Sequence, residues 1–384
     1  MSSPLLTIIM PCFNCEKTLD EAVRSIFRQN LSIPFEVVMV DDASKDGTRT
    51  LIEKLSQEFP QIRPFFHDKN MGGGAARNTA VENAAGNLIF CLDGDDILPD
   101  DTLPKMLARF EEKKGDGVLF EETRFFSSQS PKRESVKNKR IDEAVRLSDM
   151  FEKGQGFYAR VNFLYTKEAW KIAGGYPTHH GFDTQTFGFR FLSKGLKTYV
   201  APGTHYLHRR NEGASYFDRE YRSGKLSFNT YLMHEDIFFL FSEKVKNTII
   251  NFDIFRHNLL GRENLEMRIA ALYEEDPHGF FIEGYQHYLS VSGESEYIRT
   301  IQPQKSEELF AKAVHLYRNK QCAEACMIFE SLTTTYPQSK ILTMNIERCR
   351  LSESELSFKE AALDVYNRHS KRSILQKIRD TFRV

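Results

Sequence analysis

The residues in this sequence best suited to chemistry are carboxylates that follow directly after apolar runs. Asp93, Asp95 and Asp96 come after a run that begins at Leu88, and Asp42 follows another run. Carboxylates gathered in one cleft repel one another and raise each other's pKa unless a cation offsets their charge. An Asp-x-Asp pair at the end of a strand offers oxygen ligands to a hard divalent ion, which commonly keeps substrate phosphates in its shell. The pattern is therefore typical of a site for a hard divalent cation.

The elements that must position these carboxylates alternate between strand and helix up to about residue 115. Strands are predicted at residues 6–10, 35–40 and 87–92, and helices at 16–29, 48–59 and 75–85. Pro11 is expected to stop the first strand. This order with near-continuous apolar strands predicts an α/β fold, with a parallel sheet covered on both faces by helices. Because ligands bind at the carboxyl ends of such strands, the polar segments should line one edge of the sheet.

Each of these signals also has an ordinary structural reading. Residues 93–96 could form a solvated turn, because Asp-Gly is a common turn pair. Asp41 and Asp42 could start a turn and cap the helix that begins at Thr48, and residues 72–74, all glycine, could be a loop with unusual dihedrals. The glycines do not complete a dinucleotide fingerprint, because Arg77 stands where its third glycine belongs. The order of the polar segments within one continuous α/β unit is what favours a binding site.

Composition gives no general reason to expect a nucleic-acid partner. The 384 residues include 52 basic and 53 acidic side chains, for a formal net charge of -1. No run approaches the length of a membrane span, and the first residues lack the basic start of a secretory signal. The six cysteines are few, and Cys12-x-x-Cys15 has no second pair to complete a zinc site. We therefore expect a reduced, cytoplasmic protein that does not bind nucleic acid.

Four ordered segments resemble the inverting family 2 glycosyltransferases of the nucleotide-diphospho-sugar transferase (GT-A) fold. They read TIIMPCFN at 7–14, VDDASKDGT at 40–48, NMGGGAARN at 70–78 and FCLDGDD at 90–96. The resemblance extends more weakly to about residue 215. It implies a GT-A-type, mostly parallel sheet flanked by helices. It also implies metal-dependent transfer of a hexosyl or N-acetylhexosaminyl group from a nucleotide-diphosphate sugar to an acceptor hydroxyl, in surface polysaccharide or glycoconjugate synthesis.

The resemblance assigns a role to each residue on the donor side. Asp42 would accept a hydrogen bond from the nucleotide base, and Pro11 and Asn14 would lie beside that base. Arg77 would place a cation near the donor, while Asp93 would meet the ribose or the metal. These five residues are the expected nucleotide-sugar site.

The metal ligands implied by the resemblance are Asp95 and His208. Asp95 would hold Mn²⁺ or Mg²⁺ against the diphosphate, where the cation stabilises the departing nucleoside diphosphate. His208 lies in a basic segment that resembles the end of the family's catalytic domain. It could reach the metal or the diphosphate, or it could be an ordinary strand-end histidine.

The catalytic base is harder to assign, because the family usually supplies it in a Glu-Asp pair before an arginine. Aligning on Arg190 places Asp183 at the glutamate position and Thr184 where the base is expected. Threonine cannot act as a base at neutral pH, so Asp183 is our candidate, with His179 or His180 as alternatives. Asp183 could equally cap the helix that follows it.

Helical patterns dominate after about residue 222, and from residue 306 they resemble one tetratricopeptide-like unit. Its small, small, aromatic and proline positions are Ala313, Ala325, Phe329 and Pro337. One unit cannot bury a core alone, so we expect it to pack on the preceding helices or on a protein partner, and a generic helical hairpin fits as well. The expected domains are a catalytic domain at 1–220, a helical extension at 221–305 and this segment with a basic tail at 306–384.

Residues 368–384 carry six Lys or Arg side chains with apolar residues roughly on one face. Such a helix could lie on the inner face of the membrane, which would suit a lipid-linked or glycan acceptor, or it could be a solvated terminal helix.

Because the Glu-Asp pair is missing, a catalytically silent scaffold or binding module in a glycan-assembly complex is the alternative function. A nucleotidyltransferase is disfavoured, because a basic glycine-rich signature near the N-terminus is absent.

Overall fold

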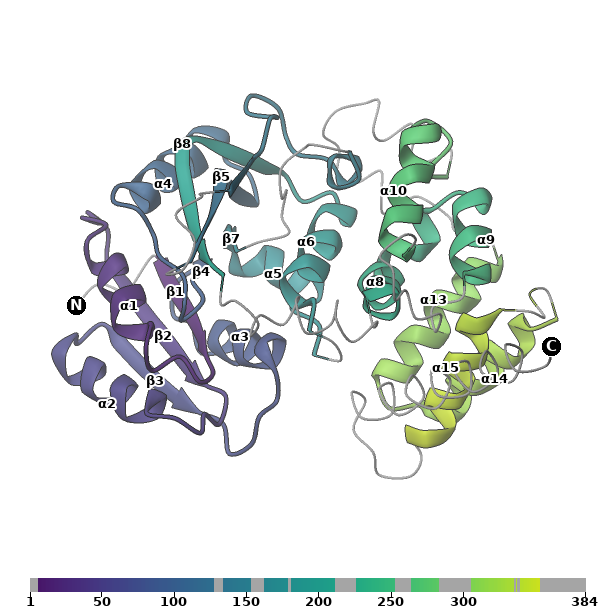
Figure 1. Cartoon of the computed structure of the whole chain (residues 1–384), viewed down its shortest axis with the longest axis horizontal. Coiled ribbons are helices and arrows are strands. Elements are labelled where there is room, and N and C mark those ends of the chain that lie inside the picture. The colour runs from purple at the N-terminus through teal and green to yellow at the C-terminus, as the bar shows by residue number, and fades with distance from the viewer. Residues whose placement is uncertain are drawn as a thin grey trace, which may run out of the picture. The chain divides into compact units, whose positions relative to one another are not determined.

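The chain forms two compact units, an α/β unit and a helical unit (Figure 1). The computed structural model describes residues 6–127, 134–152, 162–178, 181–210, 226–252, 264–282, 305–334, 336 and 339–352. The first unit comprises the described residues up to 210, and the second those from 226 onward. His179, His180, Pro337 and the basic tail at 368–384 lie outside the described residues.

The first unit is built on one eight-stranded sheet in the order β3-β2-β1-β4-β7-β5-β6, with β8 paired to β5. Its strands are β1 (Leu6–Cys12), β2 (Phe35–Asp41), β3 (Ile62–Phe66), β4 (Leu88–Cys91), β5 (Gly117–Phe126), β6 (Glu134–Lys137), β7 (Leu164–Thr166) and β8 (Thr198–Arg209). Strands β1 to β4 are parallel, β7 is antiparallel to both β4 and β5, and β8 is parallel to β5. This mostly parallel sheet with flanking helices confirms the predicted GT-A-type α/β class.

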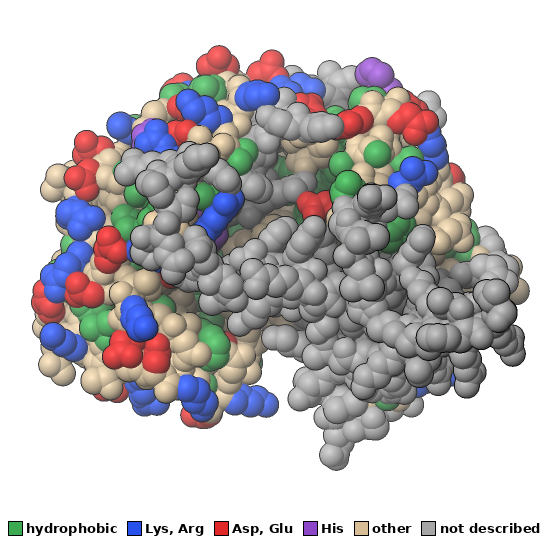
Figure 2. Space-filling model, in the orientation of Figure 1, with side chains coloured by type: hydrophobic (Ala, Val, Ile, Leu, Met, Phe, Trp, Pro, Cys, Tyr) green, Lys and Arg blue, Asp and Glu red, His purple; other side chains and the backbone are tan. Residues whose placement is uncertain are grey.

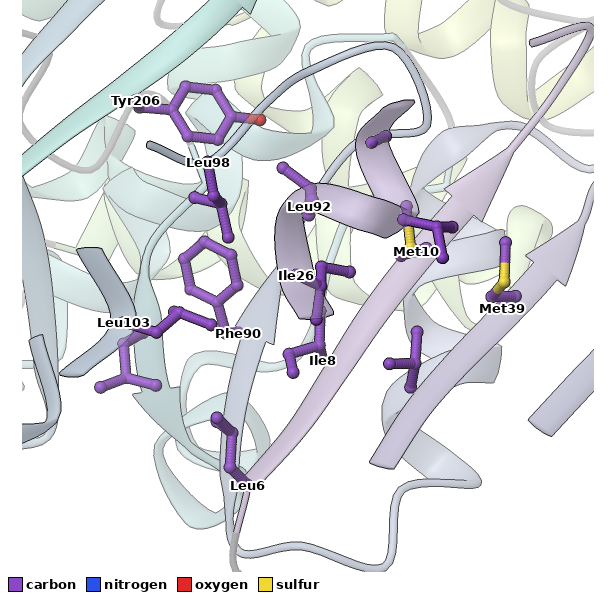
Figure 3. Close-up of a cluster of buried hydrophobic side chains, with 14 of the residues drawn as sticks. Leu6, Ile8, Met10, Ile26, Met39, Phe90, Leu92, Leu98, Leu103 and Tyr206 are labelled. Atoms are coloured by element: carbon purple, nitrogen blue, oxygen red, sulfur yellow. The ribbon is translucent and has the colours of Figure 1, made fainter. Parts of the chain in front are cut away.

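Helices cover both faces of the parallel part of the sheet. The helices of the first unit are α1 (Leu19–Phe27), α2 (Thr48–Glu58), α3 (Gly73–Glu82), α4 (Thr102–Lys113), η1 (Leu147–Met150), α5 (Lys167–Ala173) and α6 (Asp183–Ser193). Of these, α2 and α3 contact the parallel strands β1 to β3, whereas α4 and α5 contact β5, β7 and β8. Side chains alternate across a strand, so Leu6, Ile8 and Met10 of β1 share one face and belong to one buried cluster with Ile26 of α1 (Figure 3). Helix α3 contacts β1 and β2 from the other face, where its buried Ala76 allows close approach.

The carboxyl ends of β1, β2 and β4 meet at one edge, as predicted. The expectation that Pro11 stops the first strand is wrong, because β1 continues to Cys12, which pairs with Asp41 of β2. Strand β4 pairs with β1 only as far as Ile9. Beyond Ile9, β1 pairs with β2 alone. Pro11 lacks a backbone N–H, but β4 offers no strand partner for that N–H at this position, so the sheet loses no hydrogen bond.

The second unit is helical throughout its described elements. These are α8 (Leu226–His234), η2 (Glu235–Leu240), α9 (Glu243–Asn251), α10 (Leu265–Glu275), α13 (Lys305–Arg318), α14 (Cys322–Leu332) and α15 (Lys340–Ser352). Helices α13 and α14 form the predicted hairpin, with Ala313 and Ala325 fully buried. The hairpin packs on the preceding helices, since the rings of Phe310 and Phe238 lie 4.7 Å apart. Its assignment as a tetratricopeptide repeat stays a prediction.

A buried polar network joins η2 to α15 in this unit. The guanidinium of Arg348 lies 3.3 Å from the carboxylate of Glu235 and donates to Asn345 Oδ1 at 2.6 Å. The hydroxyl of Tyr231 donates to the same Glu235 oxygen at 3.0 Å and accepts from Asn345 Nδ2 at 2.9 Å. Because both charges are buried, each depends on the other for compensation.

None of the helices in the described ranges combines the length and the apolar character that crossing a bilayer requires. On the face of the first unit in Figure 2, Lys and Arg side chains are interspersed with Asp and Glu. This pattern agrees with the near-zero net charge of the chain.

Candidate active site

Asp42 follows β2 directly and holds the turn that leads into α3. Its Oδ1 accepts from the Met71 N–H at 2.8 Å and its Oδ2 from the Gly72 N–H at 2.7 Å. His67 Nδ1 lies 2.8 Å from Oδ1, and His67 Nε2 lies 3.0 Å from the Thr79 hydroxyl. Gly72 has a φ of 89°, in the region that favours glycine. Asp42 thus stabilises the turn before α3 and does not cap α2, whose N-cap is Gly47. Its contact with a nucleotide base stays a prediction.

Asn14 joins the loop after β1 to the loop after β2. Its N–H donates to Ser44 Oγ at 2.9 Å, and its Oδ1 accepts from the Lys45 N–H at 2.8 Å. Next to it, the side chain of Phe13 is 49% exposed, as is that of Met71. Neither of these two large apolar side chains was predicted at the polar edge. For Phe13, the signal in the sequence was its position, because an aromatic side chain stands directly before the predicted site residue Asn14.

Arg77 brings together two carboxylates that were predicted on separate grounds. Its Nη1 donates to Asp183 Oδ2 at 2.7 Å, and its Nη2 donates to Asp93 Oδ1. The guanidinium is buried and lies 5.8 Å from the centroid of the Tyr176 ring. Within the described part of the chain, Arg77 Nε has no hydrogen-bond partner. The donor-side carboxylate and the candidate base thus share one buried cation.

The neighbouring Asn78 fastens α3 to the turn that precedes α6. Its Nδ2 donates to the carbonyl of Tyr176 at 2.9 Å, and its Oδ1 accepts from the N–H of Tyr176 at 2.9 Å and from Trp170 Nε1 at 3.2 Å. A Cβ on Gly74 would stand 1.9 Å from the carbonyl oxygen of Pro177. The glycine at this position is therefore required by the close approach of the two segments. Sequence reasoning missed Asn78, although it follows Arg77 directly.

Asp183 is the first residue of α6 and is buried. Burial raises its pKa, Arg77 lowers it and Asp93 raises it, and the net pKa lies above the ordinary aspartate value. The residue at the helix N-cap is Phe182, but Asp183 Oδ1 accepts from the Thr184 N–H at 2.9 Å, so the side chain also satisfies a backbone donor in the first turn of α6. Its role as a base stays a prediction. A carboxylate with a raised pKa in a buried cluster has the character of a general base.

The Asp-x-Asp segment carries unfavourable like charge. Burial, Asp96 and Asp93 raise the pKa of Asp95 to about 7, while His208 lowers it. Burial lowers the pKa of His208, but the charge and hydrogen bond of Asp96, with Asp95 and Asp93, raise it overall to about 9. His208 and Asp95 are thus close enough to interact, which the sequence could only suggest. Among the described side chains, no three His, Cys, Asp or Glu residues form a ready metal cluster.

The Cys12-x-x-Cys15 pair lies beneath the Asp-x-Asp segment. Both residues are buried free thiols, and the pKa of Cys12 is raised by its hydrogen bond to Cys15 and by burial. A Cβ on Gly94 would stand 2.8 Å from Cys15 Sγ. The pair therefore packs under the turn, and Gly94 leaves room for it.

Comparison with known proteins identifies a match within the first unit. Residues 7–172 match the family described as glycosyl transferase family 2. This range runs from β1 into α5, so it includes Asp42, Arg77, Asp93 and Asp95 but not Asp183 or His208.

Curated relatives match shorter stretches of the chain. An uncharacterized glycosyltransferase of Haemophilus influenzae is 36% identical over 107 residues, which cover 28% of this chain and 42% of the relative. The Escherichia coli chondroitin synthase is also 36% identical over 107 residues, which cover 28% of this chain and 15% of the relative. The Staphylococcus aureus poly(ribitol-phosphate) beta-N-acetylglucosaminyltransferase TarS is 33% identical over 115 residues, 29% of this chain and 20% of the relative. The matches span less than half the length of these relatives. The crystal structure of Staphylococcus aureus TarS 1–349 aligns over 97% of this chain and 91% of that one, with a TM-score of 0.47 and 15% identity.

Proposed function

We propose that this protein transfers a sugar from a nucleotide-diphosphate donor to an acceptor hydroxyl during synthesis of a surface polysaccharide or glycoconjugate. The family match over residues 7–172 supports this class of reaction. The observation that carries the proposal is the ion-pair cluster of Arg77 with Asp93 and Asp183. It brings a carboxylate of the predicted donor site and a candidate base to one cation at the ligand-binding edge of the sheet.

The nucleotide would bind between the loops that follow β1 and β2. Each carboxylate oxygen of Asp42 can accept two hydrogen bonds. Oδ1 already has two partners and Oδ2 has one, so Oδ2 could accept one more bond, from an N–H of the base. The exposed ring of Phe13 offers a surface on which a base can stack, and Pro11 and Asn14 lie in the same segment. Asp93 would contact the ribose.

Asp95 and His208 are the residues that would hold Mn²⁺ or Mg²⁺. They fit a cation because the pKa of Asp95 is raised by burial and by neighbouring carboxylates, so a positive charge there would relieve the repulsion. Oxygen atoms of the diphosphate would complete the set of ligands. When bound, such an ion stabilises the negative charge that develops on the departing nucleoside diphosphate.

Asp183 is the proposed base. The acceptor hydroxyl oxygen would attack the anomeric carbon as its proton passes to the Asp183 carboxylate, and the bond from that carbon to the diphosphate would break with its electron pair on the leaving group. Attack opposite the leaving group would invert the anomeric configuration. The raised pKa of Asp183 favours its acceptance of a proton, and Arg77 would keep the carboxylate in place.

The sugar is proposed to be a hexosyl or N-acetylhexosaminyl group, because the named relatives include a beta-N-acetylglucosaminyltransferase and a chondroitin synthase. We further propose that the acceptor is a glycan or a lipid-linked glycan. Attachment of residues 368–384 to the inner face of the membrane, and binding of a protein partner by the C-terminal helices, stay predictions.

A panel of nucleotide sugars, with UDP-N-acetylglucosamine first, tests the proposal. Release of nucleoside diphosphate should be measured with glycan acceptors in Mn²⁺, in Mg²⁺ and in a chelator. We expect release with one donor and its loss in the chelator. Absence of release with every donor and acceptor, whether or not the donor binds, would reject the transferase and favour the silent scaffold.

A further inference from the structure

Asp96, the second carboxylate of the Asp95-Asp96 pair, has a different environment from its neighbour. It is fully buried and accepts three hydrogen bonds, all from β8. Its Oδ2 accepts from the Tyr206 hydroxyl at 2.6 Å and lies 3.0 Å from His208 Nδ1. Its Oδ1 accepts from the Arg209 N–H at 2.8 Å. With these three donors around it, Asp96 is fully engaged by β8.

Backbone contacts fix the same two segments against each other. Ile97 and Leu207 form an antiparallel bridge, with N–H to carbonyl distances of 3.0 and 3.1 Å. The side chain of Arg209 also donates to the carbonyl of Asp95 at 2.8 Å. The residues on either side of Asp96 and of His208 are therefore held in register. This register keeps His208 beside the Asp-x-Asp segment.

The ring of His208 is fixed in orientation by two contacts. Nδ1 faces Asp96, and the ring of Phe125 meets it edge to face, with centroids 5.5 Å apart and planes at 90°. Because a carboxylate can only accept, we assign the shared proton to Nδ1. When the imidazole is neutral, its lone pair then lies on Nε2, the nitrogen that does not face Asp96. His208 is also partly exposed, so a ligand can reach the ring.

We infer that Asp96 is a positioning residue, which holds His208 with Nδ1 protonated so that Nε2 presents its lone pair to the cation of the donor complex. A carboxylate bound to the second nitrogen of a metal-binding histidine sets its tautomer and orientation, and its loss typically weakens metal affinity by about 10- to 100-fold. The inference rests on the proposed function, and it adds a role for a carboxylate that would not touch cation or substrate.

The test is the affinity of the full chain for Mn²⁺ in the presence of UDP, followed through the electron paramagnetic resonance of free Mn²⁺. Asp96→Asn and His208→Ala should each weaken Mn²⁺ binding by about 10- to 100-fold. The double variant should be no weaker than His208→Ala alone, because the two residues act through one contact. Tyr206→Phe removes another donor to the same Asp96 oxygen and should keep Mn²⁺ affinity within about 2-fold of wild type.

Wild-type affinity in Asp96→Asn, or losses that add in the double variant, would overturn the inference while leaving the proposed function intact. Failure of the wild type to bind Mn²⁺ with UDP would instead reject the metal site itself. A second measurement needs no Asp96 variant to fold. This measurement is nuclear magnetic resonance of the wild-type protein with ¹⁵N-labelled histidine, in the presence of Mg²⁺ and UDP. The signals of His208 are assigned by their loss in His208→Ala. They should show a protonated Nδ1 and an unprotonated Nε2. The opposite tautomer, or a ring protonated on both nitrogens in the presence of Mg²⁺ and UDP, would also overturn the inference.

Discussion

Arg77 and Asp183 stand 106 positions apart in the sequence, yet Nη1 of Arg77 donates to Oδ2 of Asp183 at 2.7 Å. The same guanidinium pairs with Asp93 after β4. One buried cation thus links α3, the Asp-x-Asp segment and α6. The arrangement supports both stability and the proposed reaction, and variants can separate these two contributions.

Arg77→Met should destabilise the protein by roughly 3–5 kcal/mol, because it leaves two carboxylates without their buried cation. Urea unfolding measures this loss. Arg24→Met is the matched control, since Arg24 also pairs with two carboxylates, Asp20 and Glu58, but its side chain is 43% exposed. Exposed ion pairs contribute little, so this control should leave the unfolding midpoint nearly unchanged. Similar losses in both variants would contradict the prediction.

Asp183→Asn should separate transfer from donor binding. Transfer should fall by roughly 100-fold or more, the usual scale for a lost general base, while calorimetric titration should still detect donor with Mn²⁺. Asp95→Ala should instead lose both transfer and the metal-dependent binding of the donor. Glu168→Gln is the control, because it removes a carboxylate from the first turn of α5, where the side chain is exposed. A Glu168→Gln variant with wild-type transfer would exclude a general effect of lost charge.

Two outcomes of this experiment would revise the site. Wild-type transfer in Asp183→Asn would remove Asp183 from the mechanism and leave His179 or His180 as the base. Unaltered metal-dependent donor binding in Asp95→Ala would mean that the cation binds elsewhere.

The stability of the protein in a chelator should fall as pH rises. The folded-state pKa of Asp95 is raised from 3.8 to about 7, so its stabilising contribution is complete below the unfolded pKa and is lost as pH rises through 7. The pKa of His208 is raised from 6.5 to about 9, so the stability that His208 contributes is lost as pH rises between these two values. Asp95→Asn should therefore be roughly 1–2 kcal/mol more stable than wild type at pH 8, allowing for the solvent that reaches this group. The difference should be clearly smaller at pH 5 and should vanish only below the unfolded pKa of 3.8. Thermal unfolding at the two pH values checks this, and a pH-independent difference would contradict it.

Gly74→Ala should destabilise the protein by roughly 2–3 kcal/mol through overpacking and reduce transfer, because the new methyl meets the Pro177 carbonyl and lies 3.2 Å from Asp183 Cβ. Gly174→Ala is the contrasting variant. Its φ of +80° makes alanine strained by about 1–2 kcal/mol, but the space around it is open. It should therefore lose some stability and retain transfer. Unfolding and donor turnover are measured for both, and equal transfer in the two variants would refute the steric explanation.

In the helical unit, Arg348→Met should cost roughly 3–5 kcal/mol by leaving the Glu235 carboxylate buried without its cation. Arg350→Met, two positions along the same helix, breaks an ion pair with Glu330 in which the Arg350 side chain is 64% exposed. This second change should have little effect on the unfolding midpoint of the unit. Equal effects would show that the buried network does not hold η2 against α15.

The sequence by itself determined the parallel strands and the edge at which Asp42, Asp93 and Asp95 meet. Apolar runs and helical periodicity report local backbone geometry and burial, and the carboxyl ends of parallel strands necessarily share one edge. The same local signals misplaced the end of β1, because the tolerance of Pro11 depends on how far β4 extends beside it.

Only the tertiary structure decided which side chains are partners at that edge. The Asp96 and His208 contact spans 112 positions and depends on the pairing of β8 with β5 and on the bridge between Ile97 and Leu207. Asp183 meets Arg77 because the turn before α6 docks on Asn78. Such contacts are set by the register and packing of elements distant in sequence, and a change of one residue in strand register turns a side chain to the opposite face. Residue types and spacing therefore marked the carboxylates, and long-range packing determined the cation or histidine that each one contacts.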